Sequence, residues 1–228
     1  MKITQRVPQT EGIKGSKKWI QELIETHPDI LLRHLKQHRN LQGLKDINWV
    51  SPRKEDDFAE YRDVGFLARL GLEEHRKTLE SFWPKGGPQW DALGIDNNNP
   101  RRVFLVEAKA NIAEVITECK AESPKSREQI ESSINRVQSF LGCKSLIPWT
   151  KGFYQYANRI AHLYFMREIA GIDAFLVFIY FLNDETHIPT TKEQWQGMLE
   201  IQERLMDISS HKLQRFVVKS FIDIKEMR

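Results

Sequence analysis

The stretch QWDALGIDNNNPRRVFLVEAK, residues 89–109, decides the fold. Its two ends, Gln89–Ile95 and Arg102–Lys109, are rich in apolar and β-branched residues, a composition typical of buried strands. Between them lies Asp96–Pro100, a run of residues that favour turns. The pattern therefore predicts an antiparallel hairpin.

That hairpin would bring three charged side chains together. With the turn centred near residues 98 and 99, Asp91 lies opposite residue 106 or 107, and strand alternation directs Glu107 and Lys109 to one face. Two neighbouring carboxylates repel each other, and a divalent cation such as Mg²⁺ or Mn²⁺ offsets that repulsion through oxygen ligands. A lysine beside the cation stabilises charge that grows on a phosphoryl group. The sequence thus predicts a metal-dependent site that hydrolyses phosphodiesters.

A competing interpretation is a surface ion pair between Glu107 and Lys109. The residues before them, Val103–Val106, are all apolar, which indicates a strand with little exposed surface. Charges are rarely placed in such a strand without a partner or a task. The context therefore favours the functional interpretation.

The remaining chain predicts helices around further strands. Amphipathic spacing predicts two short helices within Lys17–His38 and further helices over the following ranges: Phe58–Leu70, Glu73–Phe82, Asn111–Lys120, Arg127–Leu141, Phe153–Ala170 and Thr191–Met206. Apolar runs predict strands at Asp173–Leu182 and Phe216–Ile224. We expect an α/β or α+β fold with a central mixed β-sheet flanked by helices, formed by one domain, 1–228, in which 1–50 is an N-terminal helical extension.

The helix predicted at Phe153–Ala170 carries a polar stripe. Gln155, Asn158, Arg159 and His162 recur at spacings of three and four in an otherwise apolar segment. One interpretation directs Gln155 and Arg159 to the metal or the phosphate, and the other makes them part of a buried hydrogen-bond network. His162 is interpreted as a core histidine.

Three segments carry a resemblance to a known superfamily. Asp91, followed sixteen positions later by Glu107-Ala-Lys109 on a second strand, resembles the PD-(D/E)xK nucleases. More narrowly, FWPKGGPQWDALG, FLVEAKA and FYQYANRIAHLYFMRE look like a family of bacterial proteins assigned to that superfamily. The similarity spans residues 66–181, although Trp90 stands where the signature has proline. It implies a restriction-endonuclease-like core, Asp91 and Glu107 as metal ligands and Lys109 as the catalytic lysine.

The resemblance also implies contributions from outside the hairpin. Members often add a glutamate from the helix before the hairpin, and we prefer Glu60, because it lies on a long predicted helix, to the alternatives Glu73, Glu74 and Glu80. A glutamine on the later helix recurs in the superfamily, which points to Gln155. Lys85, in the turn with Gly86 and Gly87, is a candidate phosphate contact, against the simpler interpretation of a loop turn.

The composition of the chain indicates which cellular compartment and which binding partners to expect. Hydrophobic residues make up 40% and charged residues 29% of the 228, as in soluble globular proteins, and the net charge of +3 tolerates nucleic acid as a partner. The longest apolar run, Ala174–Leu182, is far shorter than the roughly 20 residues that span a bilayer. No leader segment is recognisable, so we expect a cytoplasmic protein without a membrane partner. Cys119 and Cys143 are expected to be free thiols.

Two functions are compatible with these patterns. The first is a magnesium-dependent nuclease, with DNA as the expected substrate. The second is a nucleic-acid-binding or assembly module that retains the nuclease fold without catalysis. RNA as the substrate and a homodimeric assembly both stay open.

Overall fold

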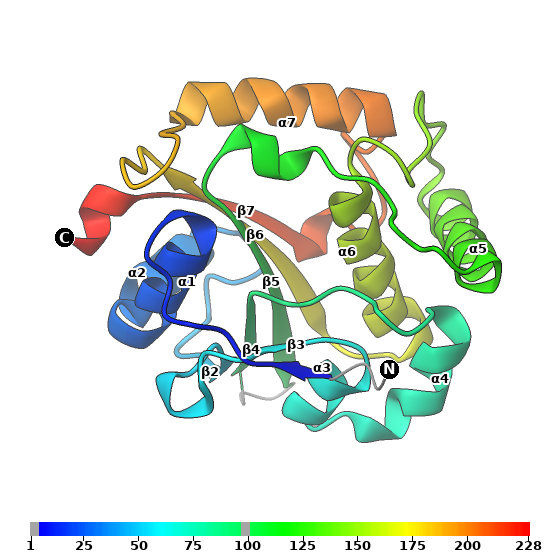
Figure 1. The fold of residues 1–228 in the computed structure, drawn as a ribbon, viewed down its shortest axis with the longest axis horizontal. Coiled ribbons are helices and arrows are strands. Elements are labelled where there is room, and N and C mark those ends of the chain that lie inside the picture. Colours follow the sequence, from blue (N-terminus) through cyan, green and yellow to red (C-terminus); the bar gives the residue numbers. More distant parts are fainter. Residues whose placement is uncertain (1–4, 97–100) are drawn as a thin grey trace.

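A computed structural model describes residues 5–96 and 101–228 and contains a five-stranded mixed β-sheet (Figure 1). The strand order is β2-β4-β5-β6-β7; the pairs β2/β4 and β4/β5 are antiparallel, and β5/β6 and β6/β7 are parallel. Their bounds are β2 (Asn48–Ser51), β4 (Ala92–Asp96), β5 (Arg102–Lys109), β6 (Ala174–Leu182) and β7 (Val217–Asp223). The predicted class, a central mixed sheet flanked by helices, is confirmed.

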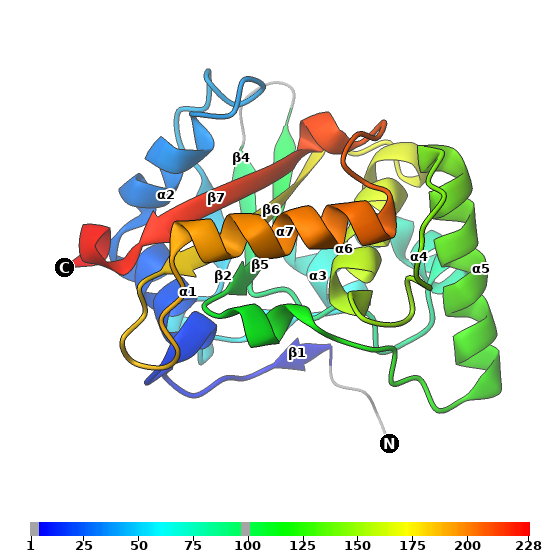
Figure 2. The ribbon, with the colours of Figure 1, turned by 90° about the horizontal axis from the view of Figure 1, so that it is seen from above.

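Helices cover both faces of this sheet (Figures 1 and 2). On one face lie α1 (Gly15–Thr26) and α2 (Pro28–Leu35). The other face is covered by α3 (Val64–Arg69), α4 (Arg76–Phe82), α5 (Pro124–Leu141), α6 (Tyr154–Tyr164) and α7 (Lys192–Met206). The short helical turns are η1 (Lys54–Asp56), η2 (Glu73–His75), η3 (Ile112–Val115), η5 (Gln214–Phe216) and η6 (Ile224–Met227), and η4 (Phe165–Ile169) continues α6 as a π-helix.

Strand alternation assigns the side chains of β5 to two cores. Val103 and Leu105 join the larger core beneath α6, whereas Phe104 and Val106 join the core beneath α1 and α2. The segment expected to be an N-terminal extension therefore supplies the helices that cover one whole face of the sheet. Since β2 begins at Asn48, that segment also contributes the start of an edge strand.

The predicted hairpin has the predicted register. Ala92 of β4 pairs with Val106 of β5, and the Asp91 backbone N–H donates to the Val106 carbonyl at 3.2 Å. Asp91 therefore lies opposite Glu107, one of the two positions expected. Residues 97–100 of the predicted turn lie outside the described residues.

The helix predicted at Phe58–Leu70 is wrong over its first half. Only Val64–Arg69 is helical, and Glu60–Tyr61 forms a short strand, β3, that pairs with β1 (Arg6–Val7). Asp57, Phe58 and Asp63 have positive φ angles of 50°, 46° and 51°, which a right-handed helix cannot contain. Apolar spacing does not reveal such backbone turns.

The helix predicted at Asn111–Lys120 is also wrong beyond one turn. Ile112–Val115 forms a 3₁₀ turn, and the chain then runs extended, with Thr117 bridged to Phe153. The Thr117 N–H donates to the Gly152 carbonyl at 2.7 Å. A partner distant in sequence therefore replaces the helical hydrogen bond.

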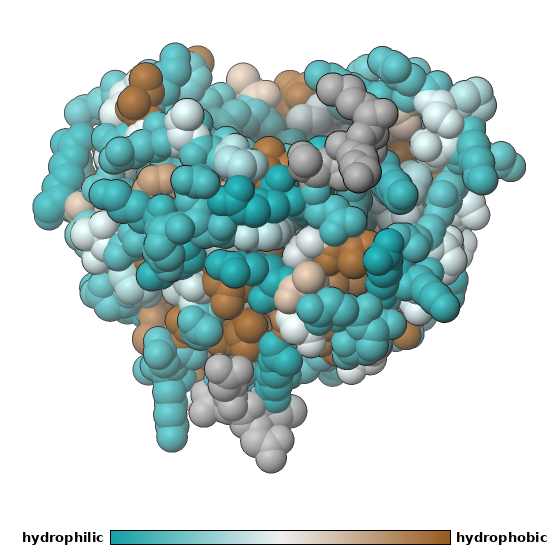
Figure 3. Space-filling model, turned by 60° about the horizontal axis from the view of Figure 1, so that its bottom comes forward, coloured by the Kyte–Doolittle hydropathy of each residue, from teal (hydrophilic) through white to brown (hydrophobic). Residues whose placement is uncertain are grey.

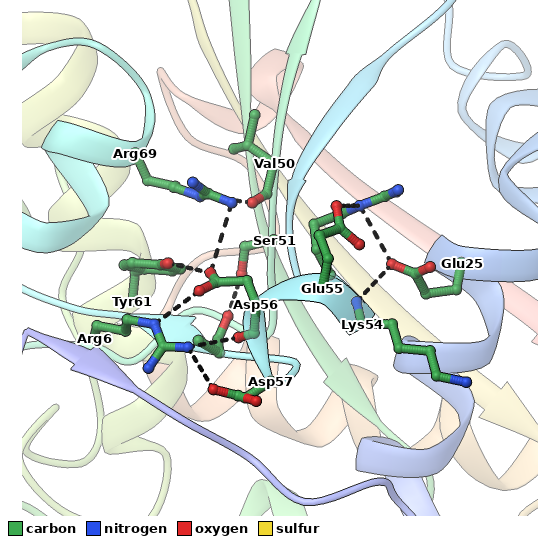
Figure 4. Close-up of polar contacts among 12 residues, drawn as sticks. Arg6, Glu25, Val50, Ser51, Lys54, Glu55, Asp56, Asp57, Tyr61 and Arg69 are labelled. Carbon is green, nitrogen blue, oxygen red and sulfur yellow. Dashed lines mark hydrogen bonds and ion pairs between the residues drawn. The ribbon is translucent and has the colours of Figure 1, made fainter.

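Strand β3 is anchored by a polar network drawn in Figure 4. Arg6 Nε lies 2.8 Å from the Asp56 carboxylate, and Arg6 Nη2 lies 2.9 Å from that of Asp57. The Tyr61 hydroxyl donates to the same Asp56 carboxylate. These contacts fix the backbone on both sides of Glu60.

The face of the molecule drawn in Figure 3 is predominantly polar. On the face drawn in Figure 3, hydrophilic side chains cover most of the area, and hydrophobic ones gather in recesses. Among the described residues, no helix combines the length and the apolar character needed to cross a bilayer. Cys119 and Cys143 are free, as predicted.

Candidate active site

A cleft of about 1010 Å³ opens beside the C-terminal end of β5. Loop 84–89, the segment 116–126 and the first turns of α6 form its walls. All of the residues selected from the sequence line it: Glu60, Lys85, Asp91, Glu107, Lys109, Gln155 and Arg159. The alternative glutamates, at positions 73, 74 and 80, do not line this cleft.

Glu107 is at the centre of the charged wall and is 3% exposed. Its Oε1 lies 2.6 Å from Lys109 Nζ, and its Oε2 accepts from Arg159 Nε at 2.6 Å and also contacts Arg159 Nη2. Burial acts to raise the pKa of Glu107, but Arg159 and Lys109 outweigh it and hold that pKa below its usual value. Glu107 is thus an ionised carboxylate with two cationic partners.

Arg159 reaches Glu107 from α6 and is itself 4% exposed. Its guanidinium also donates to the Gln89 carbonyl at 2.9 Å and to Asn158 Oδ1 at 2.8 Å. It stacks 4.8 Å from the centre of the Trp90 ring. Arg159 therefore belongs to a buried hydrogen-bond network, as one of the two interpretations predicted, and it also lines the cleft.

Lys109 is held by a second residue of the stripe. Its ammonium donates to Gln155 Oε1 at 2.9 Å, and the Gln155 N–H donates to Thr117 Oγ1 at 2.9 Å in the first turn of α6. Burial acts to lower the pKa of Lys109, but the carboxylates of Glu107 and Asp91 outweigh it and raise that pKa above its usual value. Lys109 therefore stays protonated at neutral pH.

Asp91 and Glu60 complete the acidic part of the cleft. Asp91 Oδ2 accepts the Ala108 N–H at 2.7 Å, while burial and then the nearby Glu107 and Glu60 raise its pKa well above the usual value. Glu60 accepts a hydrogen bond from the Gln89 side chain, and its pKa is also raised, chiefly by burial. Glu60 lines the cleft, but strand β3 presents it, and the helix that was predicted to carry it does not form there.

Lys85 lies exposed on the rim, in the glycine-containing turn. The N–H groups of Gly86 and Gly87 donate to the Asp63 carboxylate at 3.1 Å and 2.8 Å. Because these amides are already used within the protein, the turn interpretation accounts for the glycines. Within the turn at residues 84–88, the exposed side chain of Lys85 is the group that is available to a phosphate.

His162 is a core residue, as expected from the sequence. It is 1% exposed, its ring packs against Trp83 and Trp90, and its Nδ1 bonds to the Asn158 carbonyl at 2.8 Å. Burial lowers its pKa to about 3. A neutral imidazole in this position stabilises the core and takes no part in the cleft.

Two carboxylates of the cleft have the chemistry of ligands for a divalent cation. Within residues 5–96 and 101–228, no three Asp, Glu, His or Cys side chains are grouped as ligands of one ion. Asp91 and Glu60 are hard oxygen donors that line the same cleft, and their carboxylates repel each other. Mg²⁺ or Mn²⁺ would offset that repulsion, because these ions bind oxygen ligands. Glu107 Oε2 is bonded to Arg159 and Oε1 to Lys109, so of the two oxygens Oε1 keeps a lone pair with which Glu107 could join such a site.

Comparisons of this chain with protein-family models, with curated proteins and with solved structures found no match.

Two residues that the sequence did not single out have positioning contacts in the site. Gln89 links Glu60 to Arg159 through its amide and its carbonyl, and Thr117 fixes the start of α6 beneath Gln155. Gln89 directly precedes Trp90-Asp91, so its nearness to the hairpin was the available signal. The sequence around Thr117 gave no such signal, because that segment was expected to be helical.

Asp91→Asn is expected to raise the melting temperature in metal-free buffer near neutral pH, by about 2–4 °C for each 1 kcal/mol of repulsion removed. The pKa of Asp91 is higher in the folded than in the unfolded protein, so the folded state binds the proton more tightly. The stability from this proton is complete below about pH 4 and is lost as the pH rises through the folded pKa. The increase in melting temperature caused by Asp91→Asn should therefore become larger as the pH rises.

Thermal melts of both proteins between acidic and neutral pH measure this difference. Glu131→Gln, which removes an exposed carboxylate from α5, provides the control and should change little. A lower melting temperature for Asp91→Asn at neutral pH would mean that the carboxylate stabilises the fold instead of straining it.

Proposed function

We propose that the protein is a metal-dependent phosphodiesterase that hydrolyses nucleic acid, with DNA as the first substrate to test. The observation that carries the proposal is the convergence of Asp91, Glu107, Lys109, Gln155 and Arg159 on one wall of a cleft. Buried carboxylates and cations at hydrogen-bond distance are costly to assemble, and their clustering in a cleft favours a functional role.

Each side chain has a task in this proposal. Asp91 and Glu60 would hold a divalent cation, which when bound polarises a phosphoryl oxygen and lowers the pKa of a bound water. Lys109, oriented by Gln155, would place its ammonium against the charge that develops on the phosphate. Lys85 on the rim would contact a neighbouring phosphate of the strand.

One observation favours the second candidate, a module that binds nucleic acid or assists assembly without catalysis. Each oxygen of Glu107 already contacts a cation of the protein, Oε1 that of Lys109 and Oε2 that of Arg159. A buried carboxylate neutralised in this way can stabilise the fold without having a role in catalysis. Homodimer formation fits either candidate equally and is tested by the mass of the protein in solution.

The deciding experiment measures cleavage of supercoiled DNA, single-stranded DNA and RNA with Mg²⁺ or Mn²⁺. We expect cleavage of DNA that stops when the metal is chelated and resumes when Mn²⁺ is restored in excess. Mn²⁺ should also raise the melting temperature of the wild type, as a ligand specific to the folded state does, and should not raise that of Asp91→Ala. A wild type that cuts none of these substrates but retards DNA in a gel would support the binding module instead.

A further inference from the structure

Helix α7 carries one polar residue in its buried stripe. The inward positions of this helix are Trp195, Leu199, Gln202 and Met206. Gln202 is 1% exposed, and its Nε2 has no hydrogen-bond partner in the described part of the chain. An unsatisfied buried amide costs about 1–3 kcal/mol, so its presence calls for a physical reason.

Gln202 lines a small cavity directly behind the candidate active site. The cavity measures about 20 Å³, and its aromatic walls include Tyr156 and Tyr180. Glu107, Lys109 and Gln155 line both this cavity and the large cleft, so the Lys109–Gln155 pair separates the two spaces. A space above roughly 10–15 Å³ with several polar groups around it suits one water molecule.

The hydrogen-bond inventory around the cavity points the same way. The Lys109 ammonium has three N–H donors, of which Glu107 Oε1 at 2.6 Å and Gln155 Oε1 at 2.9 Å accept two. These two contacts leave one Lys109 donor for a further acceptor, and Gln202 Nε2 has no acceptor among the residues described. A water oxygen can accept from both groups and donate to a hydroxyl of Tyr156 or Tyr180.

We infer that this cavity is a binding site for one structural water, and that Gln202 is a positioning residue that holds the Lys109 ammonium toward the cleft through that water. The functional part of the inference rests on the proposed phosphodiesterase activity. The water site itself rests on the cavity and on the unpaired donors alone.

Crystal structures and kinetics of matched variants test the inference. Gln202→Met keeps the size of the side chain and removes its polar groups, and Gln196→Met changes an exposed glutamine of the same helix. In the wild type we expect a solvent oxygen within about 2.7–3.2 Å of both Lys109 Nζ and Gln202 Nε2. In Gln202→Met that oxygen should be gone and the ammonium should shift from Gln155.

The kinetic expectation is a loss of kcat without a change in KM. Losing one hydrogen bond to the lysine should lower kcat roughly threefold to tenfold for Gln202→Met, and Gln196→Met should match the wild type. If Gln202→Met does not fold, Tyr180→Phe removes one expected partner of the water and serves in its place.

Two results would overturn the inference: a dry cavity in the wild type, or a Gln202→Met protein with Lys109 unmoved and kcat intact. A wild type that cuts no substrate would refute the proposed function instead, and the crystal structures would still decide whether Gln202 and the water position Lys109.

Discussion

Replacing Lys109 by methionine is expected to lower the rate of phosphodiester cleavage about a hundredfold or more while the protein stays folded. The ammonium lies on the cleft wall at 2.6 Å from Glu107 and 2.9 Å from Gln155, a fixed position in which it would meet charge developing on the substrate. The fold should tolerate the change because Glu107 keeps Arg159 as a counter-ion. Initial rates at saturating Mg²⁺ and a thermal melt measure the two effects separately.

Lys45→Met is the matched control, since Lys45 is exposed and lies outside the cleft. It should cleave at the wild-type rate. If a folded Lys109→Met protein also cleaves at that rate, Lys109 is a structural partner of Glu107 and the proposed chemistry is wrong.

Arg159→Met is expected to give the largest loss of stability, about 3–5 kcal/mol in the free energy of unfolding. The change removes one of the two cationic partners of a carboxylate that is 3% exposed, together with the bonds to the Gln89 carbonyl and Asn158 Oδ1. The melting temperature should fall by roughly 6–20 °C for a domain of this size.

Two further proteins make this prediction specific. Arg33→Met breaks an ion pair with Glu226 in which the Arg33 side chain is 61% exposed, so it should cost at most about 1 kcal/mol. Glu107→Gln combined with Arg159→Met removes the buried carboxylate that has lost one of its two cationic partners, and should recover part of the loss. Equal effects of Arg33→Met and Arg159→Met would show that burial does not increase the contribution of the Glu107–Arg159 ion pair to stability.

The residues from Gln89 to Lys109 allowed the hairpin, its register and the facing of Asp91 and Glu107 to be predicted, because turn chemistry and strand alternation are local properties. The polar stripe on α6 could also be predicted from the sequence, because helical periodicity places Gln155 and Arg159 on one side of the helix. These are the parts of the site that short-range rules govern.

The missing parts depend on contacts between distant segments. Strand β3 exists because it pairs with residues near the N-terminus and because Arg6 anchors the preceding turn, and neither contact is visible in the sequence around Glu60. Gln202 shows a different limit. A single glutamine in the stripe of α7 resembles a surface residue until the cavity behind Lys109 is known.

Because side chains alternate along β5, substitutions on its two faces have different consequences. Odd positions, such as Glu107 and Lys109, face the cleft and the α6 core, whereas the even positions Phe104 and Val106 contact only the core beneath α1 and α2. A random library restricted to positions 104 and 106 would therefore change stability through the core beneath α1 and α2, whereas one restricted to the odd side would change both the cleft and the core beneath α6. Inserting a single residue within β5 would exchange the two sides and bury the charges beneath α1, so β5 admits substitutions but no change of length.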